Sequence, residues 1–198
     1  MDDATVPAGW PSRAVLDVVS GQILLFGGLV VCVALVPAGL GANKGFSFFG
    51  IHWLTVVPYA VGVLGCALFT RRALRAAAPA TPAPARARQA ADAFGLLTAG
   101  LVVTPDYAEN VLAWTHRALG ASLFVIQLVL AARLVAWAGG DPLSAAFWLF
   151  QLGGGVICAI YVLRAEGFLL QGQVLFQLAF GVVLARTLPR LPAPIRNI

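Results

Sequence analysis

Two histidines, His52 and His116, are the residues of this 198-residue chain best suited to metal or haem chemistry. Two imidazoles can ligate one haem iron, and imidazole together with carboxylates can hold zinc. The two residues belong to no His-x-x-x-His motif, and the three cysteines form no CxxC or Cys/His cluster. We therefore expect no cofactor, and a bis-histidine haem enzyme or a zinc-dependent membrane enzyme stands as an alternative to a non-enzymatic function.

Both histidines belong to polar segments, His52 to 41–53 and His116 to 105–117. These segments and a third one, 164–167, would share a membrane face if the apolar stretches between them cross a bilayer. They would then form either an aqueous rim with interfacial aromatic residues or a ligand pocket that opens outward under the aromatic segment 41–53. The candidate ligand-binding residues are His52, Asp106, Glu109, His116, Arg117 and Glu166, with Lys44 as an anion contact.

The second polar segment is predicted to be helical. Thr104 followed by Pro105 is typical of an N-cap and a first helical residue, so we expect a helix to begin there and to run on into the next apolar stretch. Spacings of three and four residues place its acidic residues and Arg117 on one face. We expect His52 to lie close to this helix, within reach of its histidine or of Glu109.

Six apolar stretches separate and flank these segments. A bilayer core about 30 Å thick needs roughly 20 apolar residues in a helix, and this chain is 60% hydrophobic and only 11% charged. The sequence therefore predicts an all-α polytopic membrane protein, a single domain of six transmembrane helices in one bundle. The stretches are 14–40, 53–69, 93–104, 116–138, 144–163 and 168–185, and the third must borrow flanking residues to span.

The basic residues indicate the topology. Ten of the 13 lysines and arginines flank the stretches on the side that holds both chain ends, and the other three, Lys44, Arg117 and Arg164, flank them on the opposite side. The positive-inside rule then places both termini in the cytoplasm, in a membrane that is most simply a bacterial plasma membrane. The net charge of +5 is thus accounted for by topology and does not indicate a nucleic-acid partner.

Several polar residues lie within the apolar stretches. Asp17 and Arg133 sit about one turn from the inner ends of their helices, where they could snorkel or pair with each other. Glutamines in hydrocarbon usually hydrogen-bond across helices, and they could instead line a polar cavity or a transport path. These glutamines are Gln127, Gln151, Gln173 and Gln177.

An alanine- and proline-rich linker, 76–87, separates the first two stretches from the last four. Its prolines favour extended, polyproline-like structure, so we expect a flexible cytoplasmic loop over about 71–91. Its arginines could alternatively dock on anionic lipid headgroups.

Two stretches, Gly45 to Tyr59 (GFSFFGIHWLTVVPY) and His116 to Gln127 (HRALGASLFVIQ), resemble six-span membrane proteins of GC-rich actinobacteria that have no characterised activity. The layout, with the first outer loop as its signature, is similar to the Frag/DRAM/Sfk group. That resemblance implies a role in lipid organisation or membrane trafficking, and no catalytic residue is carried over from it. We expect a non-enzymatic membrane protein that binds a lipid or small amphiphile at its outer face, and a small transporter or channel is the alternative.

The topology can be tested with a single cysteine at position 82. In a cysteine-free background, Pro82→Cys should resist an impermeant thiol reagent added to intact cells and react once the cells are opened. Labelling in intact cells would reverse the orientation derived from the ten-to-three distribution of basic residues.

Overall fold

The computed structural model describes residues 12–41, 43–104, 111–164 and 166–192, and this part of the chain is helical with no strand. The all-α prediction is confirmed. Five helices, α1, α3, α5, α6 and α7, are long and apolar enough to cross a membrane, and α4 is of similar length but more polar. The bounds are α1 Arg13–Leu35, α2 Phe46–Gly50, α3 Val56–Ala77, α4 Pro84–Val103, α5 Val111–Trp137, α6 Pro142–Arg164 and α7 Leu169–Thr187.

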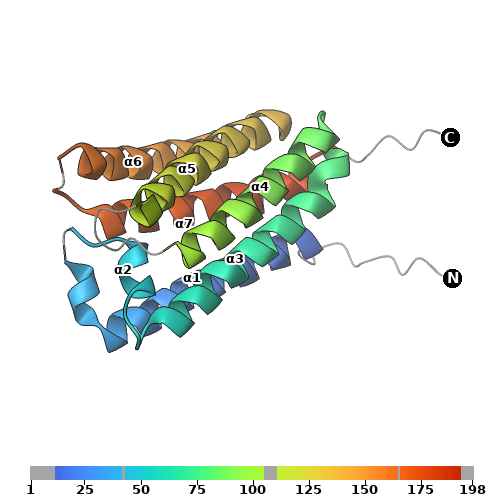
Figure 1. Cartoon of the computed structure of the whole chain (residues 1–198). Helices are drawn as coiled ribbons and strands as arrows, with labels where there is room; N and C mark the ends of the chain where they lie inside the picture. The colour runs from blue at the N-terminus through green and yellow to red at the C-terminus, as the bar shows by residue number, and fades with distance from the viewer. Residues whose placement is uncertain (1–11, 42, 105–110, 165, 193–198) are drawn as a thin grey trace, which may run out of the picture.

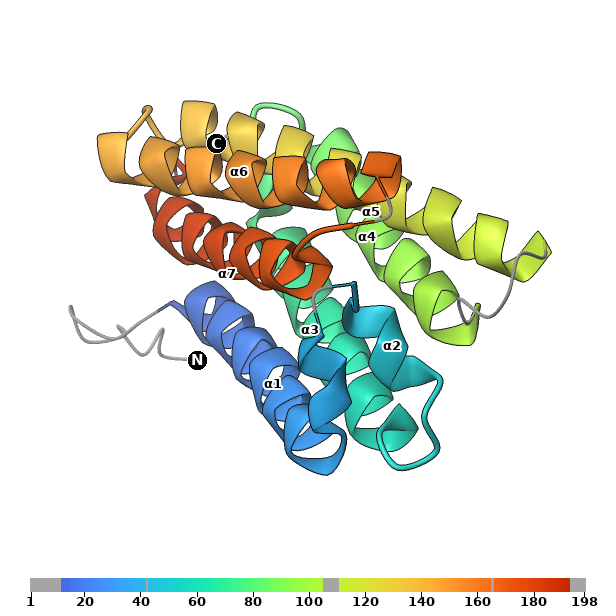
Figure 2. The same ribbon diagram turned by 90° about the vertical axis from the view of Figure 1, so that its left-hand side faces the viewer.

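The long helices run side by side along one direction (Figure 1). α1 packs against α3 and α6 against α7, while α4 lies between α3 and α5. α7 contacts α1, α5 and α6, and Figure 2 shows it between α6 and α1. The beginning of α1 and the end of α7 lie at one end of the bundle, and the short helix α2 lies at the other (Figure 1).

Glycines allow the two closest helix pairs to form. A Cβ added to Gly28 of α1 would lie 2.7 Å from the carbonyl oxygen of Pro58 and 3.2 Å from the Cα of Gly62, both on α3. A Cβ on Gly154 of α6 would lie 2.7 Å from the carbonyl oxygen of Gly172 on α7. Helices in lipid associate through such close packing of small residues, because burial of apolar side chains gives no advantage over contact with lipid tails.

The outward surface of the bundle is apolar. Large hydrophobic side chains such as Val57, Leu96 and Val162 are exposed along the long helices. Contiguous apolar surface on this scale is rare in soluble monomers and matches the surface that a bilayer would cover. The largest fully buried apolar side chains are Phe49, Phe176, Phe180, Leu134, Leu184, Val18 and Val183.

The helix boundaries bear on two expectations, one at the first apolar stretch and one at Thr104. The first apolar stretch is not one helix, because α1 ends at Leu35 and a 3₁₀ turn, Pro37–Leu40, follows. Proline disfavours helical geometry in the residue before it, which ends α1 at this point. Thr104 is the C-cap of α4, and its hydroxyl donates to the carbonyl oxygen of Gly100 at 2.7 Å. The helix predicted to begin at Pro105 starts outside the described residues, and α5 is described from Val111.

The alanine- and proline-rich linker is largely helical, so the predicted extended loop is wrong. α3 continues to Ala77, a 3₁₀ turn covers Ala78–Ala80, and α4 begins at Pro84. Alanine is the strongest helix former, and proline is well tolerated at the first position of a helix. The helix-forming alanines therefore prevail, and only residues 81–83 separate the two helical segments.

Aspartate–arginine pairs join neighbouring helices near the end of the bundle that holds the start of α1. Asp92 of α4 accepts from Arg71 at 2.8 Å and from Arg75 at 2.9 Å, both on α3. Asp17 of α1 lies 3.8 Å from Arg72. The possible pairing of Asp17 with Arg133 does not form, because the close packing of α1 on α3 brings Arg72 to Asp17 instead.

Asp141, in the turn between α5 and α6, forms the most connected ion pair. Its carboxylate accepts from the backbone N–H and hydroxyl of Ser144, at 3.0 and 2.6 Å, and so caps α6. It also binds Arg186 at 2.8 Å and Arg190 at 2.7 Å, at the end of α7. The hydrogen bonds from Ser144 and Arg186 hold the pKa of Asp141 well below its ordinary value of 3.8.

Acid should therefore weaken the link between the α5–α6 turn and α7. Because the folded-state pKa is lowered, the stabilisation is complete above pH 3.8 and is lost as the pH falls from there through the folded-state pKa. Asp141→Asn keeps a capping oxygen but removes the charge. Thermal unfolding in detergent should show a lower Tm for this variant at pH 7 and a smaller loss of Tm below pH 3.8 than in the wild type. Equal acid sensitivity of the two proteins would contradict this role.

Candidate functional site

The segment between α1 and α3, residues 36–55, folds into a cap on one end of the bundle. It contains the 3₁₀ turn at Pro37–Leu40 and the helix α2. Phe49 of α2 is fully buried and lies so close to Gly39 that a Cβ there would meet its ring at 2.3 Å. The hydroxyl of Thr55, just before α3, donates to the carbonyl oxygen of Phe49 at 2.6 Å and holds the end of α2 in place.

Hydrogen bonds attach this cap to the opposite side of the bundle. The backbone N–H of Phe46 donates to Oε1 of Gln173 on α7 at 2.7 Å. The carbonyl oxygen of Asn43 accepts from the hydroxyl of Tyr161 at 3.2 Å, and its side chain accepts from the N–H of Gly167 at 3.2 Å. The cap is therefore anchored on α6, α7 and the turn between them.

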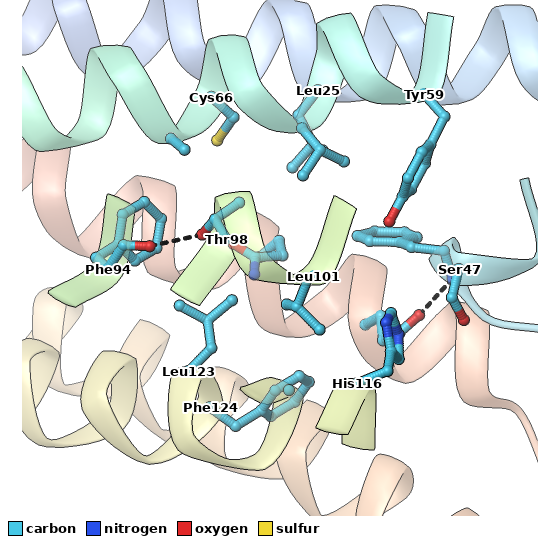
Figure 3. Close-up of a pocket in the computed structure, with 16 residues that line it drawn as sticks. Leu25, Ser47, Tyr59, Cys66, Phe94, Thr98, Leu101, His116, Leu123 and Phe124 are labelled. Carbon is cyan, nitrogen blue, oxygen red and sulfur yellow. Dashed lines mark hydrogen bonds between the residues drawn. The ribbon is translucent and has the colours of Figure 1, made fainter. Parts of the chain in front are cut away.

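A cavity of about 110 Å³ lies beneath the cap, inside the bundle. Figure 3 shows Ser47, Tyr59 and His116 gathered at the end nearest the cap, whereas Cys66 and Phe94 lie toward the other end. Gln173 and Gln177 of α7 also line it. The remaining lining is largely apolar and comprises Leu25, Phe46, Val63, Ala67, Thr98, Leu101, Gly120, Leu123 and Phe124.

Among the predicted ligand-binding residues that the structure describes, His116 is the one that lines this cavity. Its Nδ1 is hydrogen-bonded to the carbonyl oxygen of Thr104, at the end of α4. A carbonyl oxygen can only accept, so Nδ1 carries the proton and Nε2 is an acceptor in the neutral ring. Nε2 can thus accept a hydrogen bond from a hydroxyl or N–H group that enters the cavity.

The other predicted ligand-binding residues do not join His116 in the cavity. His52 and Lys44 both contact Phe48. The ring of His52 is tilted against it, with 4.5 Å between the centroids, and the ammonium group of Lys44 lies 5.0 Å from the ring centre. Arg117 and Glu166 are exposed. Asp106 and Glu109 lie outside the described residues. Of the predicted ligand-binding residues that the structure describes, His52, Lys44, Arg117 and Glu166 are therefore not part of the cavity lining.

The intramembrane glutamines form two classes. Gln173 and Gln177 line the cavity, as the cavity hypothesis predicts. Gln127 and Gln151 are both 0% exposed, and their amide oxygen and nitrogen atoms have no hydrogen-bond partner among the described residues. The expected cross-helix hydrogen bonds are therefore absent at these two positions in the described structure. Arg133, the last predicted polar residue, is exposed on α5.

Sequence reasoning missed Ser47, Tyr59 and Thr98. Each is a single polar residue in an apolar or aromatic neighbourhood, and no spacing between them marks a site. Only the packing of α2, α3 and α4 around the cavity brings them together. Within the residues that the structure describes, no group of three histidine, cysteine or acidic side chains could hold a metal ion.

No protein-family model, curated protein or solved structure matches the chain. Its function is therefore argued from the geometry of the cavity and of the surrounding helices.

The glutamines yield a test of the packing. A buried amide without partners costs about 1–3 kcal/mol, so Gln127→Leu and Gln151→Leu should leave the Tm unchanged or raise it. Gln173→Leu, in contrast, should lower the Tm because it leaves the N–H of Phe46 without an acceptor. Thermal unfolding of the three detergent-solubilised variants would compare them. A large loss of stability in Gln127→Leu or Gln151→Leu would show that these amides have partners.

Proposed function

We propose that this is a non-enzymatic, multi-pass membrane protein that binds a lipid or other small amphiphile in the cavity beneath the cap. The observation that carries the proposal is the polarity of this cavity. Ser47, Tyr59 and His116 lie at the cap end, and apolar side chains such as Leu123 line the depth. An amphiphile presents the same sequence of groups, a polar head followed by an apolar chain, and sites for small molecules are commonly apolar with a few polar groups that set orientation.

The volume limits what enters. About 110 Å³ is below the roughly 300–1,000 Å³ that is usual for drug-sized ligands. We infer that a small apolar group or the end of a single chain occupies the cavity. The polar head would then lie near α2, which forms the roof through Phe46 and Ser47.

The proposed topology has six spans, the five apolar helices together with α4, and places both termini in the cytoplasm of a bacterial cell. Its support is the place of α4 between α3 and α5 and its composition, since its charges are confined to its first half, at Arg86, Arg88 and Asp92. Beyond Asp92 the 11 residues to Val103 carry no charge, and Thr98 is the one polar residue among them. With α4 as a span, the ends of the chain and most arginines lie on one side, as the positive-inside rule requires.

A small transporter or channel is less well supported than a binding cavity. A transport path lined by the four glutamines would have to pass all of them, whereas the cavity lining includes only Gln173 and Gln177. Gln127 and Gln151 are packed within the bundle at 0% exposure.

Filling the cavity should abolish binding. Gly120 of α5 lines the cavity, and the nearest atom to a Cβ added there is a Leu101 methyl at 3.8 Å, so Gly120→Leu places a side chain in the empty space without a clash at Cβ. Gly153→Leu on α6 is the matched control, because a Cβ there meets nothing within 4 Å. The probe is unlabelled undecanoic acid, whose unbranched chain end suits the small cavity, titrated by calorimetry into protein reconstituted in phosphatidylcholine nanodiscs.

The wild type and Gly153→Leu should bind the probe saturably, and Gly120→Leu should bind it at least about tenfold more weakly, a difference of about 1.4 kcal/mol. His116→Phe should weaken binding of the corresponding alcohol more than that of the acid, because Nε2 of His116 accepts a hydrogen bond from a hydroxyl and a carboxylate has no hydrogen to donate. Equal affinity of Gly120→Leu and the wild type, or no saturable binding by the wild type, would overturn the proposal.

A further inference from the structure

A second hollow, separate from the capped cavity, lies on the surface between α4 and α5. This groove has a volume of about 410 Å³ and shares no lining residue with the capped cavity. It lies toward the start of α4 and the end of α5, where α4 and the Ala78–Ala80 turn also meet. Its volume falls within the range of about 300–1,000 Å³ that is usual for small-molecule sites.

The groove is polar at one end and apolar along the rest. Arg86 and Gln89, in the first turns of α4, lie at the same end as Arg133 and Trp137, in the last turns of α5. Farther along, the lining is Ala90, Ala93, Val125, Ile126, Val129 and Leu130. Val125 and Arg133 are eight residue steps apart, which is about 12 Å of helix. The apolar part therefore runs from the end of the bundle into its lipid-facing side.

The polar end carries positive charge that no described carboxylate neutralises. The groove lining contains no aspartate or glutamate. Within the described part of the chain, neither Arg86 nor Arg133 forms a salt bridge, whereas Arg71, Arg72 and Arg186 each pair with an aspartate. The beginning of α4 adds to this potential, because the helix dipole is positive there and the N-cap, Ala83, has no side chain that could accept from the free N–H groups.

We propose that this groove binds one anionic phospholipid of the leaflet that faces this end of the bundle. The guanidinium groups of Arg86 and Arg133 would bind the phosphate, for which the forked geometry of arginine is well suited. One acyl chain lies along Ala93, Val125 and Val129. Trp137 occupies the headgroup level, where tryptophan is enriched in membrane proteins. The two arginines by themselves would bind any phosphate. The apolar groove beneath them would favour a phosphate that carries an acyl chain, which is a phospholipid.

The test uses four variants in two matched pairs. The double variant Arg86→Gln/Arg133→Gln removes the charge, and its control is Arg88→Gln, an exposed arginine of the same helix outside the groove. Ala93→Phe fills the apolar part, and its control is Leu96→Phe, which is 74% exposed and also outside the groove. Thermal unfolding in neutral detergent establishes that each variant is folded.

Native mass spectrometry then measures lipid retained from nanodiscs that contain equal amounts of phosphatidylglycerol and phosphatidylcholine. The wild type and both controls should retain one phosphatidylglycerol in preference to phosphatidylcholine, and the double variant and Ala93→Phe should each retain it at least about tenfold less. Added glycerol phosphate, which lacks acyl chains, should not compete. Equal retention of the two lipids by the wild type, full retention by Ala93→Phe, competition by glycerol phosphate, or an equal loss in Arg88→Gln would each overturn the proposal.

Discussion

The contact between α1 and α3 at Gly28 and Gly62 is the interaction on which the rest of the fold depends. The backbones approach so closely that any Cβ at Gly28 would collide with the carbonyl oxygen of Pro58. In lipid, such contacts replace the hydrophobic driving force that assembles soluble bundles. Because α3 begins directly beside the end of α1, the 20 residues between them cannot extend away from the bundle and instead fold back over it as the cap.

The cap closes the cavity at the end of the bundle where α2 lies. Phe49 fills the space above Gly39, whereas Phe46 and Ser47 roof an interior that the long helices leave open. The hydrogen bond from the N–H of Phe46 to Gln173 closes this roof against α7. The same glutamine thus satisfies an orphan donor at the start of α2 and lines the cavity, so stability and ligand contact rest on one side chain.

Charge is distributed unevenly between the two ends of the bundle. Near the end that holds the start of α1, Asp17, Asp92 and Asp141 each pair with arginines of a neighbouring helix and tie α1 to α3, α3 to α4, and the α5–α6 turn to α7. The arginines of α3 and α7 are therefore engaged in these ion pairs. The two arginines at the polar end of the α4–α5 groove form no salt bridge within the described residues, and the proposed anionic headgroup would pair with them.

The sequence by itself determined the helical class, the apolar segments and the gathering of both histidines at one end of the bundle, because hydropathy and helix length depend only on local composition. It also pointed to Gln173 and Gln177 as cavity residues, but it could not separate them from Gln127 and Gln151, since all four are single glutamines in apolar helices. Which of them faces a cavity depends on the rotation of each helix about its own axis. The rotation of α5 turns His116 toward the cavity, whereas the turn between α2 and α3 places His52 against Phe48. The close contact of α1 with α3 brings Asp17 to Arg72 and not to Arg133. Those choices are made by backbone contacts between glycines and by the fold of the cap, which are long-range interactions that no local pattern in the sequence encodes.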